Sequence, residues 1–313
     1  MWYDTLMIKY YFRTVQDASL KQISELRNGV WIHAENPTRA ELEDLSEQLD
    51  LDMNIVEDSL DFFEVPRLEK VGEVSYFFTR YPHQDKNKES DTAPLLIVTG
   101  EAFVLTVALT KVPRLETLLE GKIEFFTTQK TKLFIQVMES VTSSFERELI
   151  QLRRAVNKDR SKIRRISNRE VEHFVNFEHK LNEMVSAVVP TNVSLQKVAT
   201  GSYVQIFPED KELIDDVRIA NEQVVESART LLKTIQNLRS ASEAILAINL
   251  NSRIKTLTVL TILLTIPMVI ASLYGMNVAL PFAANPNAFM IVVGVVVVAV
   301  GVMVWYFRRN DWL

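Results

Sequence analysis

The sequence predicts an α+β membrane protein, with a mixed α/β domain first, long helices next and two membrane-spanning helices last. No Asp, Glu, Lys or Arg occurs from Thr256 to Phe307, which is enough chain to cross a bilayer twice. Residues 209–266 contain neither glycine nor proline, a pattern typical of one long helix. We therefore expect an α/β domain at 1–121, a long-helix and stalk region at 122–255, and a transmembrane domain at 256–313.

Composition excludes several classes of site. The chain has no cysteine, which removes disulfides, thiolate metal sites and cysteine nucleophiles. The net charge is −5, and it divides unevenly: residues 251–313 carry +3, so residues 1–250 carry −8. A mildly acidic chain does not favour binding to duplex nucleic acid. We find no phosphate-binding glycine loop, Ser-His-Asp set or hydrolase carboxylate pair, so no enzyme activity is expected.

The first 121 residues alternate between strand and helix signals. Thr38 followed by Glu41 predicts a capped helix, because a capping box places these residue types three apart. Short apolar runs between glycines and prolines predict strands; they are residues 29–33, 74–78, 95–98 and 102–107.

Long helices are expected after this domain. Residues 122–189 lack glycine and proline, as do residues 209–266. The second stretch runs through the membrane boundary without a break signal, so one helix is expected to continue from the stalk into the first span. Such a rod would couple the two regions mechanically.

The uncharged segment predicts two spans, at Thr256 to about Leu273 and at Ala288–Phe307, joined by an outer loop at 278–287. Basic residues precede the first span and follow the second, and the loop between the spans carries none. Both termini are therefore expected in the cytoplasm, in a protein of the plasma (inner) membrane. The segment Met1–Thr5 offers no basic and apolar signal-peptide pattern. The flanking basic residues are Arg253, Lys255, Arg308 and Arg309.

The first span carries a polar stripe at helical spacing, whereas the second span has none. Such a stripe either packs helices together through hydrogen bonds or lines a pore, and the apolar second span favours the pore. The stripe comprises Asn251, Ile254, Thr258, Thr261, Thr265, Met268 and Ser272.

The tripeptide Gly275-Met276-Asn277 closes the first span. Glycine and asparagine also favour helix C-termini, but the position above a threonine-rich first span, before a short outer loop, decides the interpretation. The whole chain resembles the CorA family of divalent-cation channels and transporters, which have two spans and this Gly-Met-Asn motif. Residues 306–313 also resemble the basic and aromatic ending of that family.

The resemblance implies a homopentameric funnel in membrane lipids, with a selectivity filter at Gly275, Met276 and Asn277. It implies transport of Mg²⁺, with Co²⁺ and Ni²⁺ as secondary ions, through a central pore lined by the first spans. Carboxamide oxygens suit the hydrated ion, since Mg²⁺ gives up water reluctantly. The implied pore-lining residues are Asn251, Leu257 at the hydrophobic constriction, Thr261, Thr265 and Met268, and the stripe adds Ser272.

The resemblance also implies regulation by cytoplasmic Mg²⁺ bound between a carboxylate of the α/β domain and one on the stalk of the next subunit. Asp58, in Glu57-Asp58, and Asp216, in Asp215-Asp216, resemble these two elements. Solvated surface carboxylates are the alternative.

The sequence departs from the family in its outer loop, which has no acidic residue. The neutral loop leaves open a zinc-transporting relative with the same fold. A second alternative is a membrane-anchored scaffold or sensor that conducts nothing, in which the threonine stripe only packs helices.

Overall fold

The computed structural model describes residues 8–83, 92–112, 114–120, 123–160, 168–278, 286–310 and 312. The chain divides into two compact units, Met1–Lys162 with Glu172–Leu238, and Ile163–Val171 with Arg239–Leu313. Most of the outer loop and Asp311 lie outside the described residues.

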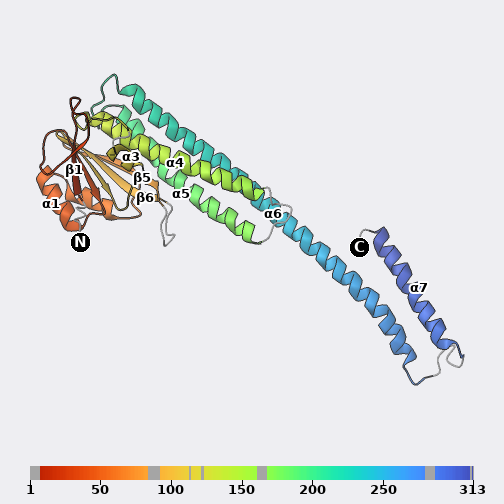
Figure 1. The fold of residues 1–313 in the computed structure, drawn as a ribbon. Coiled ribbons are helices and arrows are strands. Elements are labelled where there is room, and N and C mark those ends of the chain that lie inside the picture. Colours follow the sequence, from red (N-terminus) through yellow and green to blue (C-terminus); the bar gives the residue numbers. More distant parts are fainter. Residues whose placement is uncertain are drawn as a thin grey trace. The chain divides into compact units, whose positions relative to one another are not determined.

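The first unit is built on a seven-stranded sheet in the order β2-β1-β3-β7-β6-β5-β4 (Figure 1). Only β3 and β7 pair in parallel, from Val30 opposite Phe103 to Glu35 opposite Ala108, and the other neighbours are antiparallel. The strands are β1 (Ile8–Phe12), β2 (Lys21–Ile23), β3 (Val30–Glu35), β4 (Arg67–Val71), β5 (Val74–Pro82), β6 (Thr92–Thr99) and β7 (Phe103–Ala108).

Two short helices cover one face of the sheet. Helix α1 (Arg39–Leu49) has the predicted capping box, in which the Thr38 hydroxyl accepts from the Glu41 amide and the Glu41 carboxylate accepts from the Thr38 amide. Its Leu42 and Leu45 pack with Val56 of helix α2 (Met53–Glu57) in one buried cluster. Every second strand residue joins this cluster, as the period of a strand requires; Val30, Ile32, Tyr76, Phe78, Leu96, Val98, Leu105 and Val107 are among its members.

Helix α4 (Lys130–Arg160) packs on the opposite face. Phe77 of β5 meets Phe134 of α4 edge to face, with ring centroids 5.2 Å apart, a geometry that adds about 1 kcal/mol to the burial itself. Residues 123–129 are irregular, although helix was expected from residue 122. The reason is a contact with a distant part of the sequence: the Thr127 amide donates to the Arg13 carbonyl, and the Arg13 amide donates to Thr127 Oγ1, which ties this segment to the chain after β1.

The remaining helices are η1 (Asp58–Leu60), α3 (Leu115–Leu119), α5 (Asn168–Ala199), α6 (Lys211–Tyr274) and α7 (Ala288–Arg309). Helix α5 continues through Pro190. Helix α6 has 64 residues and continues through Pro267 without interruption, which confirms the predicted continuity of stalk and first span. At the helical rise it is about 96 Å long.

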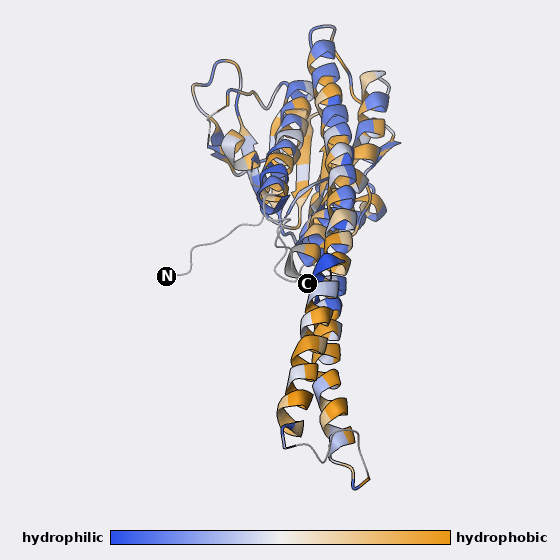
Figure 2. Cartoon of the chain, turned by 90° about the vertical axis from the view of Figure 1, so that its right-hand side faces the viewer, coloured by the Kyte–Doolittle hydropathy of each residue, from blue (hydrophilic) through white to orange (hydrophobic). Residues whose placement is uncertain are grey.

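The second unit contains the end of α6 and all of α7. Both are long and apolar enough to cross a membrane, and Figure 2 shows hydrophobic residues on most of their surface. Their bounds, Tyr274 and Ala288–Arg309, agree closely with the two predicted spans.

Candidate functional site

The Gly-Met-Asn motif lies directly after the end of α6. The Gly275 amide donates to the carbonyls of Ala271 (3.0 Å) and Ser272 (3.2 Å), and the Met276 amide donates to that of Leu273 (3.3 Å). Gly275 does not have a positive φ, so a left-handed helix cap does not explain this glycine. A Cβ added there would make only ordinary contacts, 3.4 and 3.5 Å from two carbonyl oxygens of α6. Within one chain, therefore, the backbone does not demand a glycine at 275.

The threonines of the polar stripe point their hydroxyl protons at their own helix. Thr261 Oγ1 donates to the Leu257 carbonyl at 2.9 Å, and Thr265 Oγ1 donates to the Thr261 carbonyl at 2.8 Å. Thr258 does the same toward Ile254. Since a hydroxyl has one proton and two lone pairs, these oxygens offer acceptors rather than donors to anything beside the helix. Such a surface suits the water shell of a cation.

The predicted pore residues are exposed in the single chain. Leu257 and Met268 are each 65% exposed, and Asn251, Thr261, Thr265 and Ser272 are exposed as well. Their spacing places them along one face of α6, and Asn277 follows three residues after the helix ends. The Asn277 carboxamide has no hydrogen-bond partner among the described residues, and neither has that of Asn251. The apolar side chains of this face would be covered in a membrane, by lipid or by further copies of the chain.

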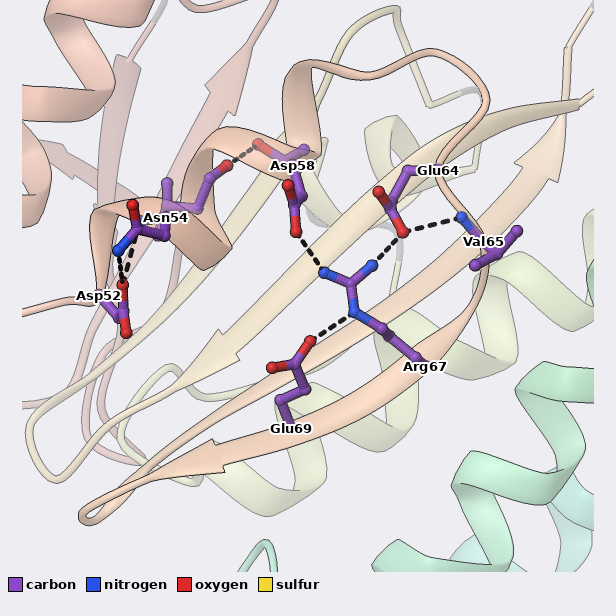
Figure 3. A network of polar contacts seen from close by, with 9 residues as sticks. Asp52, Asn54, Asp58, Glu64, Val65, Arg67 and Glu69 are labelled. Atoms are coloured by element: carbon purple, nitrogen blue, oxygen red, sulfur yellow. Dashed lines mark hydrogen bonds and ion pairs between the residues drawn. The ribbon is translucent and has the colours of Figure 1, made fainter.

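Asp58, the first candidate regulatory carboxylate, lies in a network around Arg67 (Figure 3). Arg67 Nη2 is 2.5 Å from Asp58 Oδ2, Arg67 Nε is 2.5 Å from Glu69 Oε1, and Arg67 Nη1 contacts Glu64. The guanidinium also lies over the ring of Phe78, 4.1 Å from its centroid. Burial disfavours the charge, but the hydrogen bond to Glu69 and the neighbouring carboxylates outweigh it and raise the pKa of Arg67.

This network bears directly on metal binding. Three carboxylates around one guanidinium leave two negative charges in excess, but Asp58 already has a cation at hydrogen-bonding distance. Glu57 is likewise paired with Arg39, at 3.0 Å. A divalent ion at Asp58 would have to share the carboxylate with Arg67 or displace it.

The second candidate, Asp216, is exposed near the start of α6. Its neighbour Asp215 pairs with Arg218 at 3.4 Å. The part of the chain that the structure describes holds no group of three or more His, Asp or Glu side chains placed to bind a metal ion. One chain therefore does not build a complete site from these carboxylates.

Two arginines that sequence reasoning passed over organise the neighbourhood of Asp58. Arg80 is 7% exposed and donates to the carbonyls of Phe62 and Glu64, at 3.0 and 2.7 Å, fixing the loop before β4. Desolvation lowers the pKa of Arg80.

The sequence could have indicated the role of Arg67, because Glu64 and Glu69 lie three and two positions away and carry the opposite charge. No sequence signal marked Arg80, because its acceptors are mainly backbone.

Comparisons with known proteins agree on one family. A family model described as CorA-like Mg²⁺ transporter protein matches residues 27–309. The chain is 25% identical over 292 residues to the cobalt/magnesium transport protein CorA of Methanocaldococcus jannaschii, covering 91% of each chain.

Two solved structures share the fold. The complete structure of the CorA magnesium transporter from M. jannaschii has a TM-score of 0.83 and 22% identity, over 99% of this chain and 100% of that one. The ZntB cytoplasmic domain of Vibrio parahaemolyticus has a TM-score of 0.63 and 10% identity, over 75% of this chain and 96% of that one.

Proposed function

This chain belongs to the CorA family of Mg²⁺ transporter proteins, and from that premise we propose that it conducts Mg²⁺ into the cytoplasm through a pore shared by five copies. The observation that carries the proposal is the Gly-Met-Asn motif at the end of a membrane helix whose stripe presents hydroxyl acceptors. Co²⁺ and Ni²⁺ are the secondary ions we expect.

The filter would act on the hydrated ion. Mg²⁺ demands octahedral oxygen ligands and loses its water slowly, so capture through outer-sphere hydrogen bonds is faster than stripping the shell. A ring of Asn277 carboxamide oxygens accepts hydrogen bonds from that water without adding full negative charges that would hold the ion. The small Gly275, which one chain alone does not require, leaves room for several copies to converge there.

The same chemistry would continue along the pore. Thr261 and Thr265 each have the hydroxyl proton engaged on α6, so their oxygens accept from the hydrated ion as it passes. Leu257, four residues before Thr261, would close the cytoplasmic end by excluding water from an apolar ring. Asn251, Met268 and Ser272 complete the proposed lining.

We further propose that cytoplasmic Mg²⁺ closes the pore, with Asp58 of one copy and Asp216 of the next as its ligands. A site between copies would explain why neither carboxylate belongs to a three-ligand cluster within the described chain. Because Arg67 neutralises part of the charge at Asp58, such a site would be weak, which suits a sensor of an abundant ion.

The proposal is tested by Mg²⁺ uptake into proteoliposomes loaded with a Mg²⁺-sensitive dye. We expect uptake by the wild type, suppression of uptake by internal Mg²⁺, and loss of selective uptake in Asn277→Ala. Asn249→Ala is the matched control, because Asn249 is an exposed asparagine of α6 on the side away from the stripe, and its uptake should equal that of the wild type.

The alternatives give different results in the same vesicles. If Zn²⁺ enters the vesicles and Mg²⁺ does not compete with it, the transported ion is zinc rather than magnesium. Vesicles that pass neither ion would contradict transport and favour the scaffold, in which the threonine stripe only packs helices.

A further inference from the structure

The basic residues at the inner ends of the two spans have no carboxylate partner among the described residues. Arg253 and Lys255 precede the apolar part of α6, and Arg308 and Arg309 end α7. By contrast, the arginines Arg39, Arg67, Arg218, Arg229 and Arg239 each pair with Asp or Glu. Basic residues that lack a carboxylate partner and lie at the ends of apolar helices are available to an anion from outside the chain.

Aromatic rings hold two of these cations in place. Lys255 Nζ lies 5.8 Å from the centroid of the Trp312 ring, and Arg309 Cζ lies 5.3 Å from that of Trp305. Trp312 is fixed in turn, because its amide donates to the Phe307 carbonyl at 3.0 Å and its ring packs against that of Phe307. The contact between Lys255 and Trp312 thus joins the inner end of α6 to the inner end of α7.

We propose that these residues, Lys255, Trp305, Arg308, Arg309 and Trp312, form a binding site for the phosphate group of an anionic phospholipid. We call them the headgroup cluster. The proposal requires that the two spans lie in a bilayer, and the proposed function requires the same. It does not require that the protein conducts ions.

A lipid suits the headgroup cluster better than a soluble phosphate does. The cations sit at the ends of apolar helices, where a phospholipid places its phosphate, and α7 exposes valines along the turns that acyl chains would contact. Trp305 is 60% exposed and Trp312 is 40% exposed. Indole rings favour the interface because one edge is apolar and the N–H is polar, so each ring can contact the glycerol region while its paired cation meets the phosphate.

The test measures binding of lipid to the full-length chain. The chain in detergent is titrated with phosphatidylglycerol carrying brominated acyl chains, and quenching of tryptophan fluorescence is followed, with brominated phosphatidylcholine as the neutral comparison. We expect quenching at lower concentration of phosphatidylglycerol. In the triple variant Lys255→Gln, Arg308→Gln, Arg309→Gln, binding should weaken by about fivefold for each charge removed, since one cation near an anionic surface contributes about 1 kcal/mol.

The matched control is Arg218→Gln, Arg229→Gln, Arg239→Gln, which removes three charges that have carboxylate partners and should leave the titration unchanged. Far-ultraviolet circular dichroism checks that both triple variants keep their helix content. Trp312→Phe retains an aromatic ring for Lys255 and should bind within about twofold of the wild type, whereas Trp312→Leu should bind more weakly.

Three outcomes would overturn the proposal. They are equal quenching by the two lipids, equal binding by the two triple variants, and displacement of the lipid by millimolar glycerophosphoglycerol, which would indicate a site for soluble phosphate instead. None of these readouts requires ion flux, so a chain that fails to transport Mg²⁺ can still bind lipid, and the two proposals fail separately.

Discussion

At the scale of single residues, the hydroxyl hydrogen bonds within α6 make the polar stripe a surface of hydrogen-bond acceptors. A threonine that donates to the carbonyl four residues earlier satisfies its proton inside the helix, as Thr261 and Thr265 do. The side of the helix is then lined with lone pairs. Anions find no donors there, whereas the water around a cation does find acceptors, so the proposed pore would discriminate by the sign of charge without a charged residue.

Arg67 is the residue on which the Asp58 network depends. Arg67→Gln would leave Asp58, Glu64 and Glu69 without their shared cation and would remove the stacking on Phe78. We expect a loss of about 2 kcal/mol in the free energy of unfolding, seen as a fall of roughly 4–8 °C in the thermal midpoint in detergent.

The control for Arg67 is Arg229→Gln, which breaks one ion pair between well-exposed side chains and should cost under about 0.5 kcal/mol. Equal midpoints for the two variants would contradict the stabilising role. If Asp58 is also a regulatory ligand, Arg67→Gln should lower the internal Mg²⁺ concentration that suppresses uptake.

Tyr81 predicts a pH dependence. Burial raises the pKa of Tyr81 to about 12, from an ordinary value of 10.0, and its hydroxyl donates to the Thr110 carbonyl at 2.7 Å. Below about pH 10 the folded and unfolded chains both keep the proton, so the stabilisation is complete. Between pH 10 and 12 only the unfolded chain ionises, and stability falls by roughly 2–3 kcal/mol.

Tyr81→Phe should therefore flatten the decline in thermal midpoint over this alkaline range, while costing about 1 kcal/mol at pH 7 for the lost hydrogen bond. Tyr203→Phe is the control, because its hydroxyl has no hydrogen-bond partner among the described residues. An unchanged alkaline slope in Tyr81→Phe would show that Tyr81 does not titrate in this way.

At the scale of elements, the sequence predicted those with a strong local signal. The capping box at Thr38, the uninterrupted α6 and the apolar strands β3, β5, β6 and β7 were all recognisable. Strands β1, β2 and β4 were missed. The last of these, Arg67-Leu-Glu-Lys-Val71, is half polar and lies at the edge of the sheet, so its pairing with β5 rather than its composition makes it a strand.

The residues of the candidate site also fall into those that local sequence indicates and those that it does not. The proposed filter and stripe could be named from sequence, because these residues lie within one helix and at its end, where spacing fixes the face. The surroundings of Asp58 could not, because Arg67 reaches it from β4 and Arg80 fixes the intervening loop from β5. Contacts of that kind depend on which strands pair and on how the intervening loop folds, and no single segment of the sequence sets these.

Because α6 is continuous, we expect that a break in this helix would abolish regulation and leave conduction intact. Ala244 is exposed in α6, eleven residues before Lys255. Ala244→Pro would remove a backbone hydrogen bond and kink the helix there, without touching the proposed pore or the sensor. We expect uptake that internal Mg²⁺ no longer suppresses, measured in the dye-loaded vesicles.

Ala244→Gly is the matched comparison, since glycine costs about 1 kcal/mol but keeps the helical hydrogen bond. This variant should keep its response to internal Mg²⁺. A proline variant with normal suppression would contradict coupling through the helix.

At the scale of the whole molecule, charge is distributed by environment. The first 250 residues carry −8 and the remainder +3. In the two proposals, the negative charge of the first part attracts the divalent ions that it senses, and the positive charge at the ends of the spans meets the anionic face of the bilayer. One chain would thus use both signs of charge, each toward a different partner.

The strand order also sets the sequence in which this protein can fold during synthesis. Strands β1–β3 pair locally, as do β4–β7, but the two halves are joined only by β3 against β7. Until Phe103–Ala108 leaves the ribosome, the inner edge of β3 stays open, and open edges invite pairing with other chains. Because the apolar spans follow more than 140 residues later, the sheet can close that edge before any membrane segment is exposed, and a growing chain risks aggregation in two separate intervals rather than in one.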